Sequence, residues 1–184
     1  MGKAMVLEYL LSQKKAAILE RWFHLILETY PADTSRFLKQ KKDRFVNPVG
    51  YTTSQEIEAL YEELLHGMNL DKLSASLNNI IIIRSVQDFS PSQAISFIFL
   101  LKKAIREELA SEIRENRAFD ELLEFDSRID KLALLALDIY MKCREKIYEI
   151  RVNEVKADRE RAFKLLERAN LMYGKPEVEE EPKE

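Results

Sequence analysis

The sequence predicts an all-α fold, and two observations on its 184 residues support that prediction. Turn-forming residues are scarce, since the chain contains only 4 Gly and 5 Pro. A sandwich, a barrel or a doubly wound sheet needs many more turns than this. Apolar residues also recur every three or four positions along most of the chain, which is the period of one helix face. We therefore expect a single helical-bundle domain of five to seven helices that continues into a long C-terminal helix.

The first part of the chain predicts a long helix and then a short one. A helix over about residues 3–30 places Ile18 and Trp22 on one face. Pro31 ends this helix, because the residue before a proline avoids the α region. A short amphipathic segment follows and ends near Arg44.

The sequence Asn-Pro-Val-Gly at residues 47–50 predicts a turn, since Pro fixes one backbone angle and Gly adopts conformations closed to other residues. Thr53 and Glu56 then have the spacing of a capping box, in which each side chain accepts a hydrogen bond from a free amide of the first turn. We therefore expect the next helix to begin at Thr53 and to end at His66-Gly67.

Two further helices are predicted after residue 70. The run Ile80–Ile83 is β-branched and could form a strand, but no partner strand or hairpin signal accompanies it, so a helix is favoured. Ser90 caps the following helix, Pro91 occupies its favoured first position and Gln93 completes a capping box.

The last segment begins near Phe119 or Ser127, reaches Tyr173, and contains neither Gly nor Pro. Its first half carries an apolar stripe, and neighbouring apolar residues cover other faces. A helix of this kind lies at the centre of a core. The predicted buried stripe consists of Ile129, Leu132, Ala136, Ile139, Cys143, Ile147 and Ile150.

The second half of this segment changes its apolar face. Residues that step alternately by four and three form the seam of a coiled coil, with one polar position at Arg159. This seam consists of Tyr148, Val152, Val155, Arg159, Ala162, Leu166, Ala169 and Tyr173. We expect two copies of the chain to pair along the seam as a homodimer. The alternatives are that the helix folds back on its own domain or docks on a different protein.

The predicted organisation is a helical domain over residues 1–150, a helical extension over 151–173 and a disordered acidic tail over 174–184. Residues 175–184 contain two Lys and five Glu, which accounts for the whole net charge of −3. The neutral remainder argues against a nucleic-acid partner, because phosphate binding needs an excess of Lys and Arg.

Targeting and redox signals are also absent from the sequence. No apolar stretch approaches the roughly 20 residues that span a bilayer, and no signal peptide is recognisable at the N-terminus. The single cysteine, Cys143, excludes an intrachain disulfide. We therefore expect a cytoplasmic protein without membrane insertion.

No pattern of catalytic residues is recognisable. None of the four glycines belongs to a phosphate-binding loop, and the HExxH and GxSxG motifs are absent. Glu63 and His66 form a single Glu-x-x-His, whereas a di-iron site needs two. We expect His24 to be exposed and His66 to lie at a helix end. The sequence therefore predicts no enzyme, no catalytic residues, no metal and no cofactor; a haem-binding sensor is an alternative.

One ionisable pair is a candidate site. Asp138 lies among leucines on an apolar helix, and a buried carboxylate needs a cation or hydrogen-bond donors. Arg84, on another very apolar helix, is the candidate partner of a buried ion pair. The alternatives are an exposed Asp138 and a ligand site. Arg84 could also pair with Asp88 at i,i+4.

Four stretches resemble the RsbRD N-terminal domain, the sensory part of RsbR-type co-antagonists of the bacterial stressosome. They are RSVQDFSPSQA at residues 84–94, residues 130–145, RFVNPVG at 44–50, and the region from Trp22 to Pro31. The resemblance covers about residues 7–155. It implies an all-α sensory domain, often compared with a non-haem globin fold, whose long helix leads to an output domain such as STAS or a histidine kinase. Neither output domain is recognisable before residue 184, so we expect a stand-alone form.

Together, these observations predict a non-enzymatic sensory, regulatory or adaptor domain that acts through protein–protein interaction. Its protein partner has no signature in the sequence. The change of apolar face between Ile147 and Val152 would let a movement in the bundle reach the seam. The alternatives are a ligand- or haem-binding globin-like sensor and a passive structural subunit of a larger complex.

Overall fold

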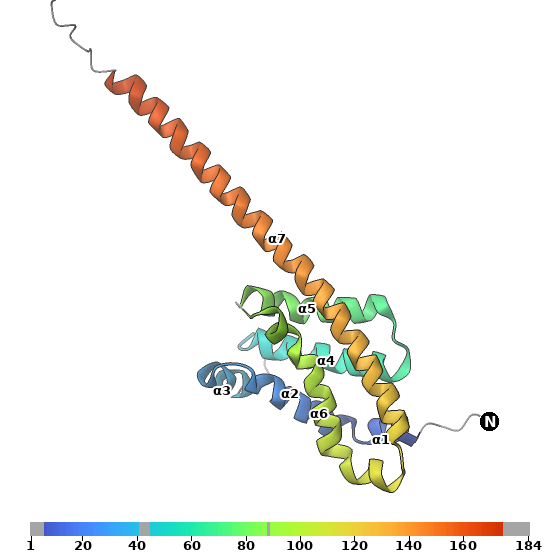
Figure 1. Ribbon diagram of the computed structural model, residues 1–184. Helices are drawn as coiled ribbons and strands as arrows, with labels where there is room; N and C mark the ends of the chain where they lie inside the picture. Colours follow the sequence, from blue (N-terminus) through green and yellow to red (C-terminus); the bar gives the residue numbers. More distant parts are fainter. Residues whose placement is uncertain (1–5, 41–44, 88, 175–184) are drawn as a thin grey trace, which may run out of the picture. The chain divides into compact units, whose positions relative to one another are not determined.

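The computed structural model describes residues 6–40, 45–87 and 89–174, and these ranges contain seven helices and no strand (Figure 1). The helices are α1 (Val6–Gln13), α2 (Lys15–Glu28), α3 (Ala32–Gln40), α4 (Pro48–His66), α5 (Leu70–Val86), α6 (Pro91–Glu115) and α7 (Phe119–Tyr173). The predicted all-α fold is therefore confirmed. None of the described helices is long and apolar enough to cross a membrane.

The chain divides into two compact units, of which the first ends at Arg144 and the second begins at Glu145. We call the described residues up to Arg144 the body. α7 belongs to both units, so we call its residues 119–144 the N-terminal half and its residues 145–173 the C-terminal half. Residues 175–184 lie outside the described residues, and the predicted disordered tail stays a prediction.

The start of α4 differs from the sequence prediction. Asn47 caps this helix through its Oδ1 atom, which accepts from the Gly50 amide at 2.8 Å, and Pro48 is the first helical residue. The Asn47 side-chain amide donates to the Leu38 carbonyl, also at 2.8 Å. A Cβ atom on Gly50 would lie 2.3 Å from Nδ2 of Asn47, so this cap requires a glycine. The predicted turn and the capping box at Thr53 are therefore wrong, since Thr53 is buried within α4.

α5 and α6 agree with the sequence prediction. The run Ile80–Ile83 lies within α5 and is helical. The cap of α6 is Ser90, whose hydroxyl oxygen accepts from the Gln93 amide at 3.3 Å, while Oε1 of Gln93 accepts from the Ser90 amide at 3.0 Å. Pro91 is the first helical residue. The capping box therefore forms as predicted.

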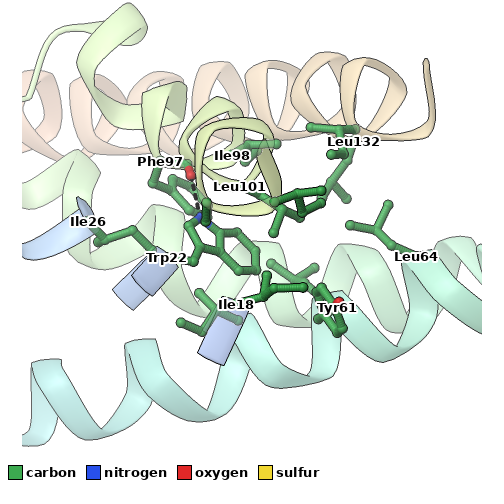
Figure 2. Close-up of a cluster of buried hydrophobic side chains, with 14 of the residues drawn as sticks. Ile18, Trp22, Ile26, Tyr61, Leu64, Phe97, Ile98, Leu101 and Leu132 are labelled. Carbon is green, nitrogen blue, oxygen red and sulfur yellow. Dashed lines mark hydrogen bonds between the residues drawn. The ribbon is translucent and has the colours of Figure 1, made fainter. Parts of the chain in front are cut away.

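The core of the body includes Trp22, whose side chain has no exposed surface (Figure 2). Its indole nitrogen donates to the Phe97 carbonyl at 2.7 Å and joins α2 to α6. Tyr61 of α4 is equally buried, and its hydroxyl donates to the Leu11 carbonyl at 3.0 Å. Both rings therefore bury their apolar surface while their polar atoms keep a partner. The other residues labelled in this cluster are Ile18, Ile26, Leu64, Ile98, Leu101 and Leu132.

The N-terminal half of α7 supplies one side of this core. Leu132 is 1% exposed, and the Tyr140 hydroxyl donates to the Phe89 carbonyl at 2.8 Å. Burial decreases beyond Tyr140, since Cys143 is half-buried and Ile150 is exposed. The predicted buried stripe is therefore too long at its C-terminal end, and the residues of α7 that the body buries end near Tyr140.

Candidate functional site

The body contains one fully buried cation among its described residues, Arg84 on α5. Only 1% of its surface is exposed. One guanidinium nitrogen donates to the Gln93 carbonyl at 3.0 Å, and the other donates to the Thr29 hydroxyl at 2.9 Å. Thr29 follows the last residue of α2, and Gln93 lies in the first turn of α6. Arg84 therefore ties the ends of two helices to α5.

Three aromatic rings surround the same guanidinium group. Its carbon lies 5.3 Å from the ring centre of Tyr30, 4.8 Å from that of Phe89 and 5.2 Å from that of Phe97. The Tyr30 and Phe89 rings also meet edge to face, with 5.3 Å between their centres. The negative face of an aromatic ring attracts a cation, most strongly where water is excluded. We call Arg84, these rings and its two hydrogen-bond acceptors the Arg84 cluster.

Burial lowers the pKa of Arg84, and the nearby Tyr30 hydroxyl offsets part of that effect. The guanidinium still carries its charge at neutral pH, because its ordinary pKa lies far above that range. Among the described residues, the Gln93 carbonyl, the Thr29 and Tyr30 hydroxyls and three rings stabilise this charge, and no carboxylate forms an ion pair with it. Asp88, the predicted i,i+4 partner, lies outside the described residues.

An open hollow of about 660 Å³ borders the Arg84 cluster. Its described lining consists of Thr29, Tyr30, Pro31, Thr34, Gln87, Phe89 and Gln93. These residues offer hydroxyl and amide groups beside two aromatic rings, and none of them is charged. The volume is within the roughly 300–1,000 Å³ of small-molecule sites, so the hollow is large enough for a small ligand.

Sequence reasoning missed the aromatic part of this cluster. A usable signal was present, because Tyr30 directly precedes Pro31 and Phe89 directly precedes the Ser90 cap. Both rings therefore lie at predicted helix boundaries. Helix ends that converge on one buried cation can place such rings around it, but the convergence itself is a property of the tertiary fold.

The structure does not bring Arg84 and Asp138 together. Asp138 is exposed on α7, although it lies between the buried residues Ala136 and Tyr140. The predicted buried ion pair is therefore not formed, and the alternative of an exposed Asp138 is the one observed. Apolar neighbours in the sequence did not indicate burial, because on a helix they point in different directions from Asp138.

Both histidines lie on the surface of the body. His24 is exposed, as predicted. His66 is the last residue of α4, and its ring nitrogens lie 3.7 Å from a Glu8 oxygen and 3.4 Å from a Glu62 oxygen. Within the described part of the chain, no three residues of the types His, Cys, Asp and Glu form a group that could hold a metal ion.

The seam lies on an unbroken helix. No turn interrupts α7 between Phe119 and Tyr173. Val152, Val155 and Leu166 are 50%, 69% and 61% exposed. The side chain of Tyr173 lies outside the described residues. Every described residue from Tyr148 to Met172 is exposed, so the apolar stripe is accessible in the single chain.

The charged residues of the seam and its borders interact within α7. The Arg159 guanidinium lies over the Phe163 ring, with 5.6 Å between its carbon and the ring centre. Asp158 accepts from Arg161 at 3.5 Å. Asp158, one of the two carboxylates that flank Arg159 in the sequence, is thus directed to another arginine, and Arg159 places a positive charge on an apolar stripe.

Comparisons with known proteins identify the family of the chain. An uncharacterized protein of Archaeoglobus fulgidus is 27% identical over 158 residues, which cover 83% of this chain and 92% of that protein. No solved structure matches the chain significantly. The profile of the RsbT co-antagonist protein RsbRD N-terminal domain matches residues 16–155, from the start of α2 into the C-terminal half of α7. The chain therefore belongs to the RsbRD N-terminal domain family.

Proposed function

We propose that this protein is a cytoplasmic, non-enzymatic sensory or regulatory domain of stressosome-like signalling that works as a homodimer paired along the seam. Membership in a co-antagonist family supports the regulatory role. The body would receive the signal, and the C-terminal half of α7 would pass it to another protein. The open hollow beside the Arg84 cluster has a volume that suits a small ligand.

The observation that carries this proposal is the exposed seam. Apolar residues repeat at heptad spacing over the C-terminal half of α7, and the described ones are exposed. Monomeric proteins rarely expose long contiguous apolar surfaces, which usually mark contacts with other molecules. In proteins, most of the stability of a helix also comes from packing of its apolar face. Pairing with a second copy would cover the apolar stripe and would also stabilise the helix.

The continuity of α7 supports a link between the body and the seam. The N-terminal half contributes Leu132 and Tyr140 to the core of the body, and the same helix carries the seam. Packed cores and helix pairs have discrete arrangements, so a change in one arrangement can bias the other through a stiff helix. A ligand or partner of the body would thereby alter how two seams pair.

Sedimentation velocity on the whole chain tests the proposal. We expect wild-type protein to be a dimer at tens of micromolar, a range in which about micromolar affinities are populated. Leu166→Asp places a charge on the seam and should weaken association by at least about tenfold. Leu134→Asp is the matched control, because Leu134 is also an exposed leucine of α7, at 66%, and lies outside the seam.

Two results would contradict the proposal. Wild-type protein that stays monomeric at these concentrations would leave the seam as a docking surface for a different protein, as expected for a passive structural subunit. Equal weakening by both aspartate variants would place the dimer contact on the body or on all of α7. The Trp22 fluorescence of both variants should match that of wild type, because Trp22 is buried in the body.

A further inference from the structure

We infer that two copies of this chain pair along the seam in antiparallel orientation, with Arg159 of each copy facing Ala162 of the other. This inference rests on the proposed homodimer and adds its geometry. It uses the six inner residues of the seam, all of which the structure describes as helical and exposed. They are Val152, Val155, Arg159, Ala162, Leu166 and Ala169.

A parallel pair would bring like charges together. In a parallel, in-register coiled coil each seam residue faces its own copy, so the two Arg159 side chains would share one layer of an apolar interface. At such a position a charged residue reduces stability, and two like charges repel each other. The residues that flank the seam on its two sides, which we call its borders, also meet across a parallel pair. A residue on one border faces the partner residue five positions further along on the other border, which pairs Arg151 with the partner's Lys156. Both of these contacts are unfavourable.

Asp158, the carboxylate that precedes Arg159, does not relieve the repulsion within a single chain. Asp158 precedes Arg159 but bonds to Arg161, and Arg159 itself lies over the Phe163 ring. The parallel arrangement would therefore add a second arginine to a layer that already contains one.

An antiparallel pair separates these like charges, because the two Arg159 side chains then lie in neighbouring layers, three residues apart along the helix, and no longer share one layer. The spacings between successive inner residues of the seam are three, four, three, four and three, so the pattern is the same in both directions along the helix. Val152 can therefore face the partner's Ala169, and Val155 can face the partner's Leu166. Arg159 then faces the partner's Ala162, and all six inner positions are paired when both copies are counted.

The sizes of the facing side chains also favour this orientation. A parallel pair would stack Ala162 on Ala162 and Ala169 on Ala169, which leaves two layers with little to fill them. The antiparallel pair places each alanine opposite a larger residue, and close packing without voids stabilises an interface. The stem of Arg159 can occupy the space beside the partner's Ala162 while its guanidinium stays in water.

The borders of the seam agree with the antiparallel pair. On one border, Lys156 of each copy faces the partner's Phe163; on the other, Asp158 faces the partner's Leu165. Phe163 and Leu165 are 56% and 64% exposed in the single chain. A lysine stem covers apolar surface while its ammonium group reaches water. No like charges face each other across either border over this stretch.

Cysteine cross-linking distinguishes the two orientations. Cys143→Ser removes the only native thiol, and Val155→Cys and Leu166→Cys are then introduced in separate chains. The chains are mixed, allowed to exchange and oxidised with glutathione, and the products are identified by mass. We expect the mixed Val155→Cys with Leu166→Cys dimer to exceed either self-linked dimer by at least about tenfold, because a disulfide needs Cα atoms within roughly 7 Å.

Each other outcome overturns the inference. Self-linked Val155→Cys and Leu166→Cys dimers, with little mixed product, would demonstrate a parallel pair and leave the proposed homodimer intact. A dimer in sedimentation that gives no cross-link would place the contact outside the seam. A monomer in sedimentation would reject both the orientation and the homodimer. Glu160→Cys, at an exposed position outside the seam, measures random cross-linking.

Discussion

The two halves of α7 carry similar apolar residues, but the chain covers only one of them. In the N-terminal half, Leu132 and Tyr140 are buried by the body, and Asp130 pairs with Lys102 of α6 at 2.7 Å. In the C-terminal half the described apolar residues from Tyr148 onwards are exposed, and the ion pair between Asp158 and Arg161 lies within the helix itself. An apolar stripe thus shows which face of a helix can be buried. Whether the same chain buries that face depends on where its other helices pack.

The largest effect should come from a matched pair of leucines on α7. Leu132→Ala removes a side chain that is 1% exposed and should lower the free energy of unfolding of the body by about 2–5 kcal/mol, because it leaves a cavity. Leu166→Ala, at 61% exposure, should leave that free energy unchanged within about 0.5 kcal/mol. Urea denaturation of both variants measures the difference. Equal destabilisation would mean that the body also depends on the C-terminal half.

A pair of arginines sharpens the comparison. Arg84→Lys keeps the buried charge but loses the planar group that bonds to Gln93 and Thr29 and contacts three rings. We expect it to destabilise the body by about 2–3 kcal/mol. Arg159→Lys should leave the body's stability unchanged, because Arg159 lies on the exposed seam. Thermal unfolding of both variants tests this, and an unaffected Arg84→Lys would show that the Arg84 cluster is not a structural tie.

Alkaline pH should destabilise the body through a buried tyrosine, Tyr61. Burial raises the pKa of the Tyr61 hydroxyl, so the folded body favours the neutral phenol. This contribution is complete below about pH 10, the unfolded pKa, and is lost as pH rises towards the folded pKa, by up to about 1.4 kcal/mol per pH unit. Tyr61→Phe should reduce that alkaline loss and cost about 1 kcal/mol at neutral pH.

The control for this pH effect is Tyr9→Phe, since Tyr9 is 62% exposed on α1. It should keep both the neutral stability and the alkaline loss of wild type. Urea midpoints measured between pH 7 and the alkaline range provide the comparison. If Tyr61→Phe loses stability with pH as steeply as wild type, another group is responsible for the loss.

The smallest effect concerns a helix start. Ser90→Ala removes the side chain that caps α6 and should destabilise the body by about 1 kcal/mol. Ser127→Ala is the control, because the Ser127 hydroxyl is exposed on α7 and donates to the Leu123 carbonyl of its own helix. Thermal unfolding should separate the two variants; a cap that contributes nothing would leave their midpoints equal.

Local signals mark the starts of both α4 and α6, but only the start of α6 was predicted correctly. Ser90 and Gln93 lie three residues apart and satisfy each other, so the start of α6 could be predicted from these positions alone. At α4 the true cap, Asn47, is also local, since it bonds to the Gly50 amide and precedes a proline at the first helical position, but these residues were interpreted as a turn. Only its second bond, to the Leu38 carbonyl, depends on where α3 lies.

The candidate sites differ in how much of each could be predicted from the sequence. The heptad spacing of the seam is visible in the sequence, whereas the helix ends that surround Arg84 meet only in the folded body. Asp138 was placed with Arg84 because both lie among apolar residues, but the structure exposes Asp138 and buries Arg84. The orientation of a side chain around its helix axis decided the outcome, and that orientation follows from the packing of all the helices.

The burial of Trp22 gives the protein a built-in optical probe of a single region. It is the only tryptophan of the chain, its side chain has no exposed surface, and it lies in the body. Its fluorescence should therefore have the blue-shifted emission of an indole shielded from water, and it should shift to the red only when the body opens. Events confined to the C-terminal half of α7 should leave this emission unchanged. A ligand that changes it would be acting on the body, even if its final effect is on pairing.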